Sequence, residues 1–178
     1  MDYQKAASYW EEKEEQSVKM DRDLLLSEME KFIIAHNTCA LATGCGDFIR
    51  CTPIEYSYKD SKFWILSEGG LKFLALEGNK NVCLAIFDSF SGFNKLGGMQ
   101  VTGMAEVIEP WSEEYLSLLA FRKIAAENLK KLPHTMYLIK ITPVRIDFLS
   151  AEFKKMGFDY RQHLLLGPAP IKNSVNES

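Results

Sequence analysis

Residues suited to binding a phosphate group gather in two short segments of the sequence. The first is Arg50-Cys51-Thr52-Pro53, and the second is Ser67-Glu68-Gly69-Gly70, followed at once by Leu71 and Lys72. Glycines that lead into a helix expose backbone N–H groups at its positive end, where an anion is stabilised. An arginine adds a two-pronged donor, a lysine adds a point charge, and the neighbouring threonine and serine add hydroxyl groups. The combination is typical of a pocket for a phosphate monoester.

Each of these residues also has an ordinary structural role. A Gly-Gly pair before a helix commonly forms only a turn, a lone lysine on a helix commonly faces solvent, and an arginine on a strand commonly pairs with a carboxylate. Alternation along a strand places Arg50 and Thr52 on the same face. The convergence of the residues at the ends of neighbouring strands favours the phosphate pocket.

The elements that must position these segments are mostly strands. We expect strands at residues 38–43, 48–58, 62–67, 81–88, 98–108 and 136–149, and helices at 3–19, 21–37, 71–77 and 112–131. Six strands joined mostly by hairpin-type turns predict a mainly β fold with flanking helices, built as a small antiparallel barrel. Pro53 and Pro143 interrupt their strands, which favours a barrel that is split rather than closed, with a bulge or bend at Pro143.

The chain divides into three predicted parts, and its composition argues against several classes of protein. Residues 1–20 form a helical arm, 21–166 the barrel domain, and 167–178 an extended tail. The net charge of −3 argues against a nucleic-acid binder, and no apolar run approaches the roughly 20 residues of a membrane helix. No signal sequence is evident at the start, so we expect a cytoplasmic protein.

The four cysteines and three histidines do not show the paired spacing of a zinc site. Cys39, Cys45, Cys51 and Cys83 are therefore expected to be reduced and buried as small apolar residues. No metal site is predicted.

Five segments, in order along the chain, resemble the pyridoxamine-phosphate-oxidase-like family of flavin split barrels. The match covers about two thirds of the chain. The segments are Ala40-Leu41-Ala42-Thr43, Arg50-Cys51-Thr52-Pro53-Ile54, residues 63–72, Gln100-Val101-Thr102-Gly103-Met104-Ala105-Glu106-Val107, and Ile141-Thr142-Pro143-Val144-Arg145-Ile146.

The resemblance implies a six-stranded antiparallel split β-barrel that binds FMN and works as a homodimer, with two flavins in the subunit interface. It also implies which residues bind the cofactor: Arg50, Cys51, Thr52, Pro53, Leu66, Ser67, Gly70, Lys72 and Gln100. Within this set, Lys72 and the residues just before it would bind the phosphate. Gln100 would reach the isoalloxazine ring from the other subunit.

Departures from the family pattern bear on the substrate. Leu71 stands where true pyridoxamine-phosphate oxidases carry an arginine, and residues 112–131 lack their Tyr/Arg/Ser substrate-phosphate cluster. Arg161-Gln162-His163 only faintly matches their C-terminal Arg-x-His segment. These differences argue against vitamin B6 oxidation and place the chain nearer the general-stress-protein-like branch.

The expected function is therefore a flavin-dependent oxidoreductase of unknown substrate, with a nicotinamide or other small molecule as electron donor. No acid–base residue is assigned, since His36, Glu55, Tyr56, Tyr58 and Glu68 have ordinary packing or surface roles as alternatives. Two other functions stay open. One is a flavin-binding sensor without turnover, and the other is the same barrel carrying haem or a deazaflavin, with His134 and His163 as candidate haem ligands.

Overall fold

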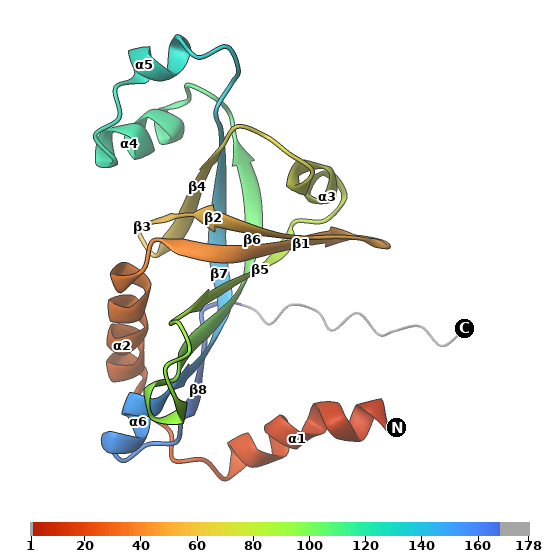
Figure 1. The fold of residues 1–178 in the computed structure, drawn as a ribbon, viewed down its shortest axis with the longest axis vertical. Coiled ribbons are helices and arrows are strands. Elements are labelled where there is room, and N and C mark those ends of the chain that lie inside the picture. The colour runs from red at the N-terminus through yellow and green to blue at the C-terminus, as the bar shows by residue number, and fades with distance from the viewer. Residues whose placement is uncertain (1, 168–178) are drawn as a thin grey trace.

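The computed structural model describes residues 2–167, except for the side chains of residues 7, 10, 11 and 14. Within these residues eight strands form one antiparallel sheet (Figure 1). The strands are β1 (Thr38–Cys45), β2 (Phe48–Glu55), β3 (Ser57–Lys59), β4 (Lys62–Ser67), β5 (Asn81–Phe87), β6 (Gly97–Ile108), β7 (Tyr137–Ser150) and β8 (Arg161–Leu165). The helices are α1 (Tyr3–Glu15), α2 (Arg22–Ala35), α3 (Lys72–Gly78), α4 (Glu113–Phe121), α5 (Ala126–Lys130) and α6 (Ala151–Lys155), with a 3-10 turn η1 (Phe93–Lys95).

The antiparallel sheet curls into a half-barrel, which confirms the predicted split-barrel fold. The strand order is β2-β1-β5-β6-β7-β4-β3, with β8 added beside β7. The strand count of six was too low for two reasons. The expected strand 48–58 breaks at Tyr56, whose backbone N–H donates to Asn37 O at 2.8 Å, and β8 was not anticipated.

One main core fills the concave side of the sheet and is closed by α2. Asp21 caps this helix by accepting from the N–H groups of Asp23 and Leu24, as the sequence predicts. The helix buries Leu25, Met29 and Ile33 against the strands. A smaller second core forms where α4 covers the outer side of β4, β6 and β7. The expected single helix 112–131 is wrong, because the chain turns at Lys123 with φ +56 and separates α4 from α5.

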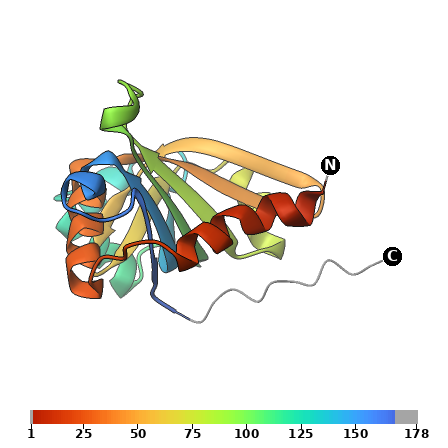
Figure 2. The same cartoon turned by 90° about the horizontal axis from the view of Figure 1, so that it is seen from below.

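The helix α1 projects from the body near α6 and β8, on the side away from α2 (Figure 1 and Figure 2). The expected N-terminal arm, residues 1–20, contains this helix. The expected tail 167–178 lies outside the described residues apart from Gly167. No helix within residues 2–167 has both the length and the apolar character needed to span a membrane.

The predicted bulge at Pro143 is present, and its tight packing predicts the effect of a substitution at Gly103 on stability. The ladder between β6 and β7 shifts register between Thr102 and Gly103, opposite Pro143. A Cβ on Gly103 would lie 2.8 Å from the backbone oxygen of Thr142. We therefore expect Gly103→Ala to lower the free energy of unfolding by about 1–3 kcal/mol, since backbone has to move.

A matched control for this prediction lies on the same strand. A Cβ on Gly98 would meet its nearest atom at 3.8 Å, an ordinary contact. Gly98→Ala is expected to change the free energy of unfolding by less than about 0.5 kcal/mol in urea titrations. Equal effects of the two alanines would contradict the bulge explanation.

The cysteines only partly follow the expectation of burial. Cys39 is buried, and that burial raises the pKa of its thiol to about 12. Cys83 is half-buried, whereas Cys45 and Cys51 are exposed. All four are free thiols, and no group of residues in the described part of the chain could hold a metal ion.

Candidate functional site

The turn between β4 and α3 is built around its glycines and the buried side chain of Lys72. Gly69 and Gly70 have φ values of +132 and +104, a region that favours glycine. Ser67 Oγ donates to Gly69 O at 3.1 Å, and Gly69 N–H donates back to Ser67 Oγ at 3.3 Å. The turn lines an open cavity of about 520 Å³ together with Leu66 and Met136. The structure thus brings Leu66, Ser67 and Gly70 together at one cavity.

Lys72 lies beside this turn in an unusual electrostatic environment. Its side chain is only 6% exposed, and its ammonium group donates to Gly69 O. Within the described residues it forms no ion pair with a carboxylate. Burial lowers the pKa of Lys72 below its usual value. A buried ammonium without a negative partner is costly, so this site attracts an anion.

Arg50 and Thr52 share one face of β2, as alternation predicts. Arg50 is exposed and lies opposite Thr43 in the β1–β2 ladder. Thr43 is only 3% exposed, and its Oγ1 has no hydrogen-bond partner in the described part of the chain. An orphaned hydroxyl beside Arg50, for which no ion pair is found among residues 2–167, is a second sign of a polar group missing from this region.

The helix α3 connects the two segments predicted to bind a phosphate because it follows one of them and packs against both β1 and β2. Its C-terminal end is fixed to the tip of the β1–β2 hairpin: Asn79 Nδ2 donates to Gly44 O at 2.8 Å, and a Cβ on Gly78 would meet Cys45 Sγ at 2.6 Å. The helix has only seven residues. We therefore assign the attraction for anions mainly to Lys72 and the glycine turn, and less to the helix end.

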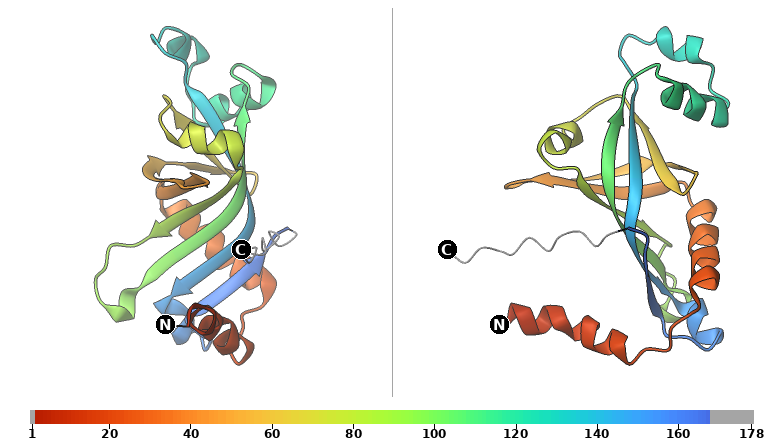
Figure 3. Two further views of the ribbon diagram at one scale, coloured as in Figure 1. Left: turned by 90° about the vertical axis from the view of Figure 1, so that its right-hand side faces the viewer. Right: turned by 180° about the vertical axis from the view of Figure 1, so that it is seen from behind.

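The remaining predicted residues, Cys51, Pro53 and Gln100, lie on the opposite, outer face of the sheet. Two cross-strand rows of residues run over this face, from β2 to β8. Figure 3 shows the curled sheet that carries them from two further sides. One row is Pro53, Ala40, Ala85, Gln100, Asp147 and His163, and the other is Cys51, Ala42, Cys83, Thr102, Arg145 and Leu165. Small side chains make the β2, β1 and β5 part of this face shallow. Within one chain, Gln100 therefore lies on the opposite face of the sheet from Arg50 and Thr52.

The polar half of the outer face was not anticipated from the sequence. Arg145 donates to both carboxylate oxygens of Asp147, at 2.8 and 2.6 Å. His163 lies directly opposite Asp147 in the β7–β8 ladder. The alternation of Arg145 and Asp147 along β7 indicated that both side chains lie on one face of the sheet. Because β8 was not recognised in the sequence, His163 could not be placed opposite Asp147.

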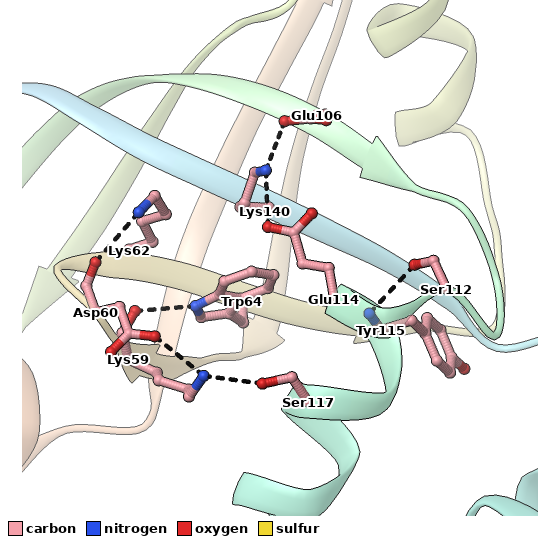
Figure 4. A network of polar contacts seen from close by, with 10 residues as sticks. All are labelled: Lys59, Asp60, Lys62, Trp64, Glu106, Ser112, Glu114, Tyr115, Ser117 and Lys140. Carbon is pink, nitrogen blue, oxygen red and sulfur yellow. Dashed lines mark hydrogen bonds and ion pairs between the residues drawn. The ribbon is translucent and has the colours of Figure 1, made fainter.

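A further polar cavity of about 770 Å³ lies between the β3–β4 hairpin and α4 (Figure 4). Lys140 is held there by Glu106 at 2.7 Å and Glu114 at 2.9 Å. Burial acts to lower the pKa of Lys140, but the two carboxylates outweigh it and raise the pKa above its usual value. Lys59 pairs with Asp60 at 3.0 Å. Lys59 also donates to Ser117 Oγ of α4 at 3.2 Å. Because both lysines have partners, we interpret this network as a structural tie of α4 to the hairpin and to β6 and β7.

None of the residues left open as acid–base candidates forms a catalytic pair at the phosphate turn. Tyr56 donates its hydroxyl to Ile33 O at 2.7 Å, and burial raises the pKa of this phenol. Tyr58 lies 3.4 Å from Glu30, and Glu55 pairs with Arg122 at 3.0 Å.

The two histidines nearest these elements are likewise bound to neighbours. His36 bridges Phe32 O at 2.7 Å and Asp88 at 3.0 Å. His134 lies 3.7 Å from the exposed carboxylate of Glu68. These contacts are structural ties between elements, and they leave the catalytic residue of the chain unassigned.

The comparisons with known proteins agree with this fold. The family model described as pyridoxamine 5'-phosphate oxidase matches residues 25–150, which span the sheet from α2 to the end of β7. No sequence among curated proteins matches significantly.

Several solved structures share the fold at low sequence identity. HutZ, the haem storage protein of Vibrio cholerae, is 17% identical over 66% of this chain and 88% of its own, with a TM-score of 0.55. ChuZ of Campylobacter jejuni is 14% identical over 83% of this chain and 62% of its own, with a TM-score of 0.62. General Stress Protein 26 of Bacillus anthracis is 19% identical over 80% of this chain and 98% of its own, with a TM-score of 0.56.

Proposed function

Since the chain belongs to the pyridoxamine 5'-phosphate oxidase family, we propose that it binds FMN and acts as a flavin-dependent oxidoreductase. The active form would be a homodimer with the two flavins at the subunit interface. The leucine at position 71 and the absence of a substrate-phosphate cluster in residues 112–131 argue against a vitamin B6 phosphate as substrate.

The observation that carries this proposal is the buried ammonium of Lys72 beside the glycine turn. An FMN phosphate would give it the negative partner that the described residues do not provide. The Gly69 and Gly70 backbone leaves room for close approach, and Ser67 supplies a hydroxyl. The donor set of the turn therefore fits a phosphate monoester.

We propose that the other predicted residues contact the remaining parts of the flavin. Arg50 and Thr52 would contact the phosphate and ribityl chain from β2. Gln100 would hydrogen-bond the ring of the partner's flavin from the outer face, where Ala40, Ala85 and their neighbours leave a shallow surface for a flat ring. FMN, when bound, supplies the hydride chemistry, while the chain binds it, orients it and excludes water.

Absorption spectroscopy and sizing of the purified chain test the proposal. We expect the two visible bands of bound flavin after incubation with FMN, a dimer by light scattering, and bleaching of those bands by NADH or NADPH. A colourless protein that binds no flavin at saturating FMN would overturn the proposal. Flavin that no reductant in the test can reduce would favour the sensor over the enzyme.

The lowered pKa of Lys72 predicts how the affinity for FMN depends on pH. Because burial lowers this pKa, Lys72 loses its proton at a lower pH than an exposed lysine, whose pKa is 10.5. The affinity for FMN should therefore fall as the pH rises through the lowered pKa, since the neutral amine attracts the phosphate less. Riboflavin, which lacks the phosphate, should show no such fall in fluorescence titrations. A parallel pH dependence for both flavins would exclude Lys72 as the phosphate ligand.

Haem is a second candidate because of one residue on the outer face. Structures with the same fold include a haem storage protein and a haem-binding protein of Mycobacterium smegmatis. His163 lies on the outer face opposite Asp147, which could hold the imidazole in position for an axial ligand. A Soret band after haem addition that is lost in His163→Ala, together with failure to bind FMN, would favour this function.

A further inference from the structure

A small pocket lies on the outer face of the sheet beside the row that contains Gln100, where β5, β6 and β7 run next to one another (Figure 1). Its volume is about 290 Å³, at the lower end of the range for small-molecule pockets and suited to a single ring. We call it the Phe87 pocket. Its lining includes Phe87, Gly98, Gln100, Asp147 and Leu149.

The Phe87 pocket is open because a glycine interrupts a cross-strand row of side chains. Phe87 lies opposite Gly98 in the β5–β6 ladder, and Gly98 lies opposite Leu149 in the β6–β7 ladder. A Cβ on Gly98 would meet its nearest atom, Phe87 Cβ, at an ordinary 3.8 Å, so packing does not demand a glycine there. Glycine weakens a strand, and in a strand interior it often marks a site that a ligand approaches closely.

The aromatic side chain of the Phe87 pocket is accessible to a ligand. Phe87 is 61% exposed, whereas Phe63 and Phe148, which also lie on strands, are almost fully buried. Contact with a flat ligand would remove apolar surface of this ring from water and allow stacking. The position of Phe87 beside a gap in its row therefore favours a planar ligand.

The polar side of the Phe87 pocket offers a neutral amide. Gln100 is exposed, and its side chain makes no hydrogen bond within the part of the chain that the structure describes. Asp147, opposite Gln100, already accepts from Arg145 with both carboxylate oxygens, at 2.8 and 2.6 Å. Arg161 also lines the pocket, and we assign no role to its charge. The available polar group is thus an amide that both donates and accepts.

We propose that the Phe87 pocket binds a flat neutral ring that carries a carboxamide, as the reduced nicotinamide ring of NADH does. Phe87 stacks against the ring above Gly98, and Gln100 donates to and accepts from the carboxamide. A glutamine amide has two N–H donors and two acceptor sites, so contact with a flavin ring is compatible with this role. The assignment of this ring as the electron donor to FMN rests on the proposed function, whereas its binding does not.

Titration of the flavin-free, full-length protein with NADH, followed by the fluorescence of the nicotinamide ring, tests the proposal. Gly98→Ala should weaken NADH binding about fivefold to tenfold, because the methyl group takes up part of the space for the ring, and Phe87→Ser should weaken it similarly through the loss of stacking. Gln100→Leu should weaken it about fivefold through the lost hydrogen bonds. The affinity for ADP-ribose, which lacks the nicotinamide ring, should change by less than about twofold in all three variants when measured by calorimetry.

A matched control for Phe87→Ser lies on α4. Phe121→Ser removes a phenylalanine that is 50% exposed and should leave NADH binding unchanged. The proposal would be overturned by a wild-type protein that does not bind NADH, by wild-type NADH affinity in both Gly98→Ala and Phe87→Ser, or by an equal loss of affinity for NADH and ADP-ribose. A loss of the dimer in Phe87→Ser would also overturn it, because the pocket would then be a contact between copies.

Flavin absorbance after incubation of the same variants with FMN separates this proposal from the proposed function. Binding of NADH that depends on Gly98 and Phe87, in a protein that binds no FMN, overturns only the proposed function. Binding of FMN together with NADH affinities that the substitutions do not change overturns only the role of the Phe87 pocket.

Discussion

Replacing Lys72 by methionine is expected to weaken FMN binding about 100-fold, while the affinity for riboflavin changes by less than about threefold. Methionine keeps most of the volume of the buried stem and removes only the ammonium group. The loss is large because Lys72 is only 6% exposed, so its attraction to a phosphate is weakly screened. Fluorescence titration of both flavins against wild type and variant measures the two affinities.

The design of this experiment separates phosphate binding from stability. Lys72 is a buried cation without a carboxylate partner among the described residues, so methionine should leave the flavin-free protein at least as stable as wild type. Lys31→Met, on the exposed surface of α2, is the matched control and should bind both flavins normally. An equal loss of FMN and riboflavin affinity in Lys72→Met would mean that Lys72 supports the fold of the turn rather than the phosphate.

The turn between β4 and α3 could be predicted from the sequence because its residues are close together in the chain. Ser67, Gly70 and Lys72 lie within six consecutive residues, and the order strand, glycines, helix fixes their arrangement. The burial of Lys72 could not be predicted in the same way. It depends on α3 packing against β1 and β2, which precede it by some 20 to 30 residues. A lone lysine on a helix commonly faces solvent, the ordinary alternative at this position, whereas the tertiary packing buries Lys72.

The strand β8 escaped prediction because a polar residue occupies one of its inward positions. Gln162 is 3% exposed, yet its amide is satisfied: it accepts from Met20 N–H at 3.0 Å and donates to Val18 O at 3.1 Å. Buried polar residues with complete hydrogen bonds interrupt the apolar alternation by which strands are recognised. Without β8, the row that ends at His163 could not be anticipated. The family resemblance is confirmed over residues 25–150, whereas the roles of the cofactor-binding residues stay predictions.

Phe63→Ala is expected to lower the free energy of unfolding by about 3–5 kcal/mol, a large part of the 5–15 kcal/mol typical of a domain. Phe63 is fully buried on β4, and its ring lies 5.2 Å from the Tyr56 ring and 5.1 Å from the Tyr58 ring. It therefore joins the two strands that flank the break at Tyr56 to the main core. Urea unfolding of the flavin-free protein, followed by circular dichroism, measures the effect.

The outcome also decides whether the curled sheet unfolds as one unit. Phe63 lies in the main core opposite Ile141 of β7, whereas the phosphate turn begins only four residues later at Ser67. If the barrel is one cooperative unit, Phe63→Ala should shift the whole transition to lower urea with an unchanged slope, and FMN affinity measured well below the transition should stay within about threefold of wild type. Phe121→Ala, at the half-exposed end of α4, should move the transition by less than about 0.5 kcal/mol. A reduced slope, or a loss of FMN binding before the main transition, would instead mean that the β4–α3 turn unfolds separately from the rest of the sheet. The buried environment of Lys72 would then not be a stable feature of the folded chain.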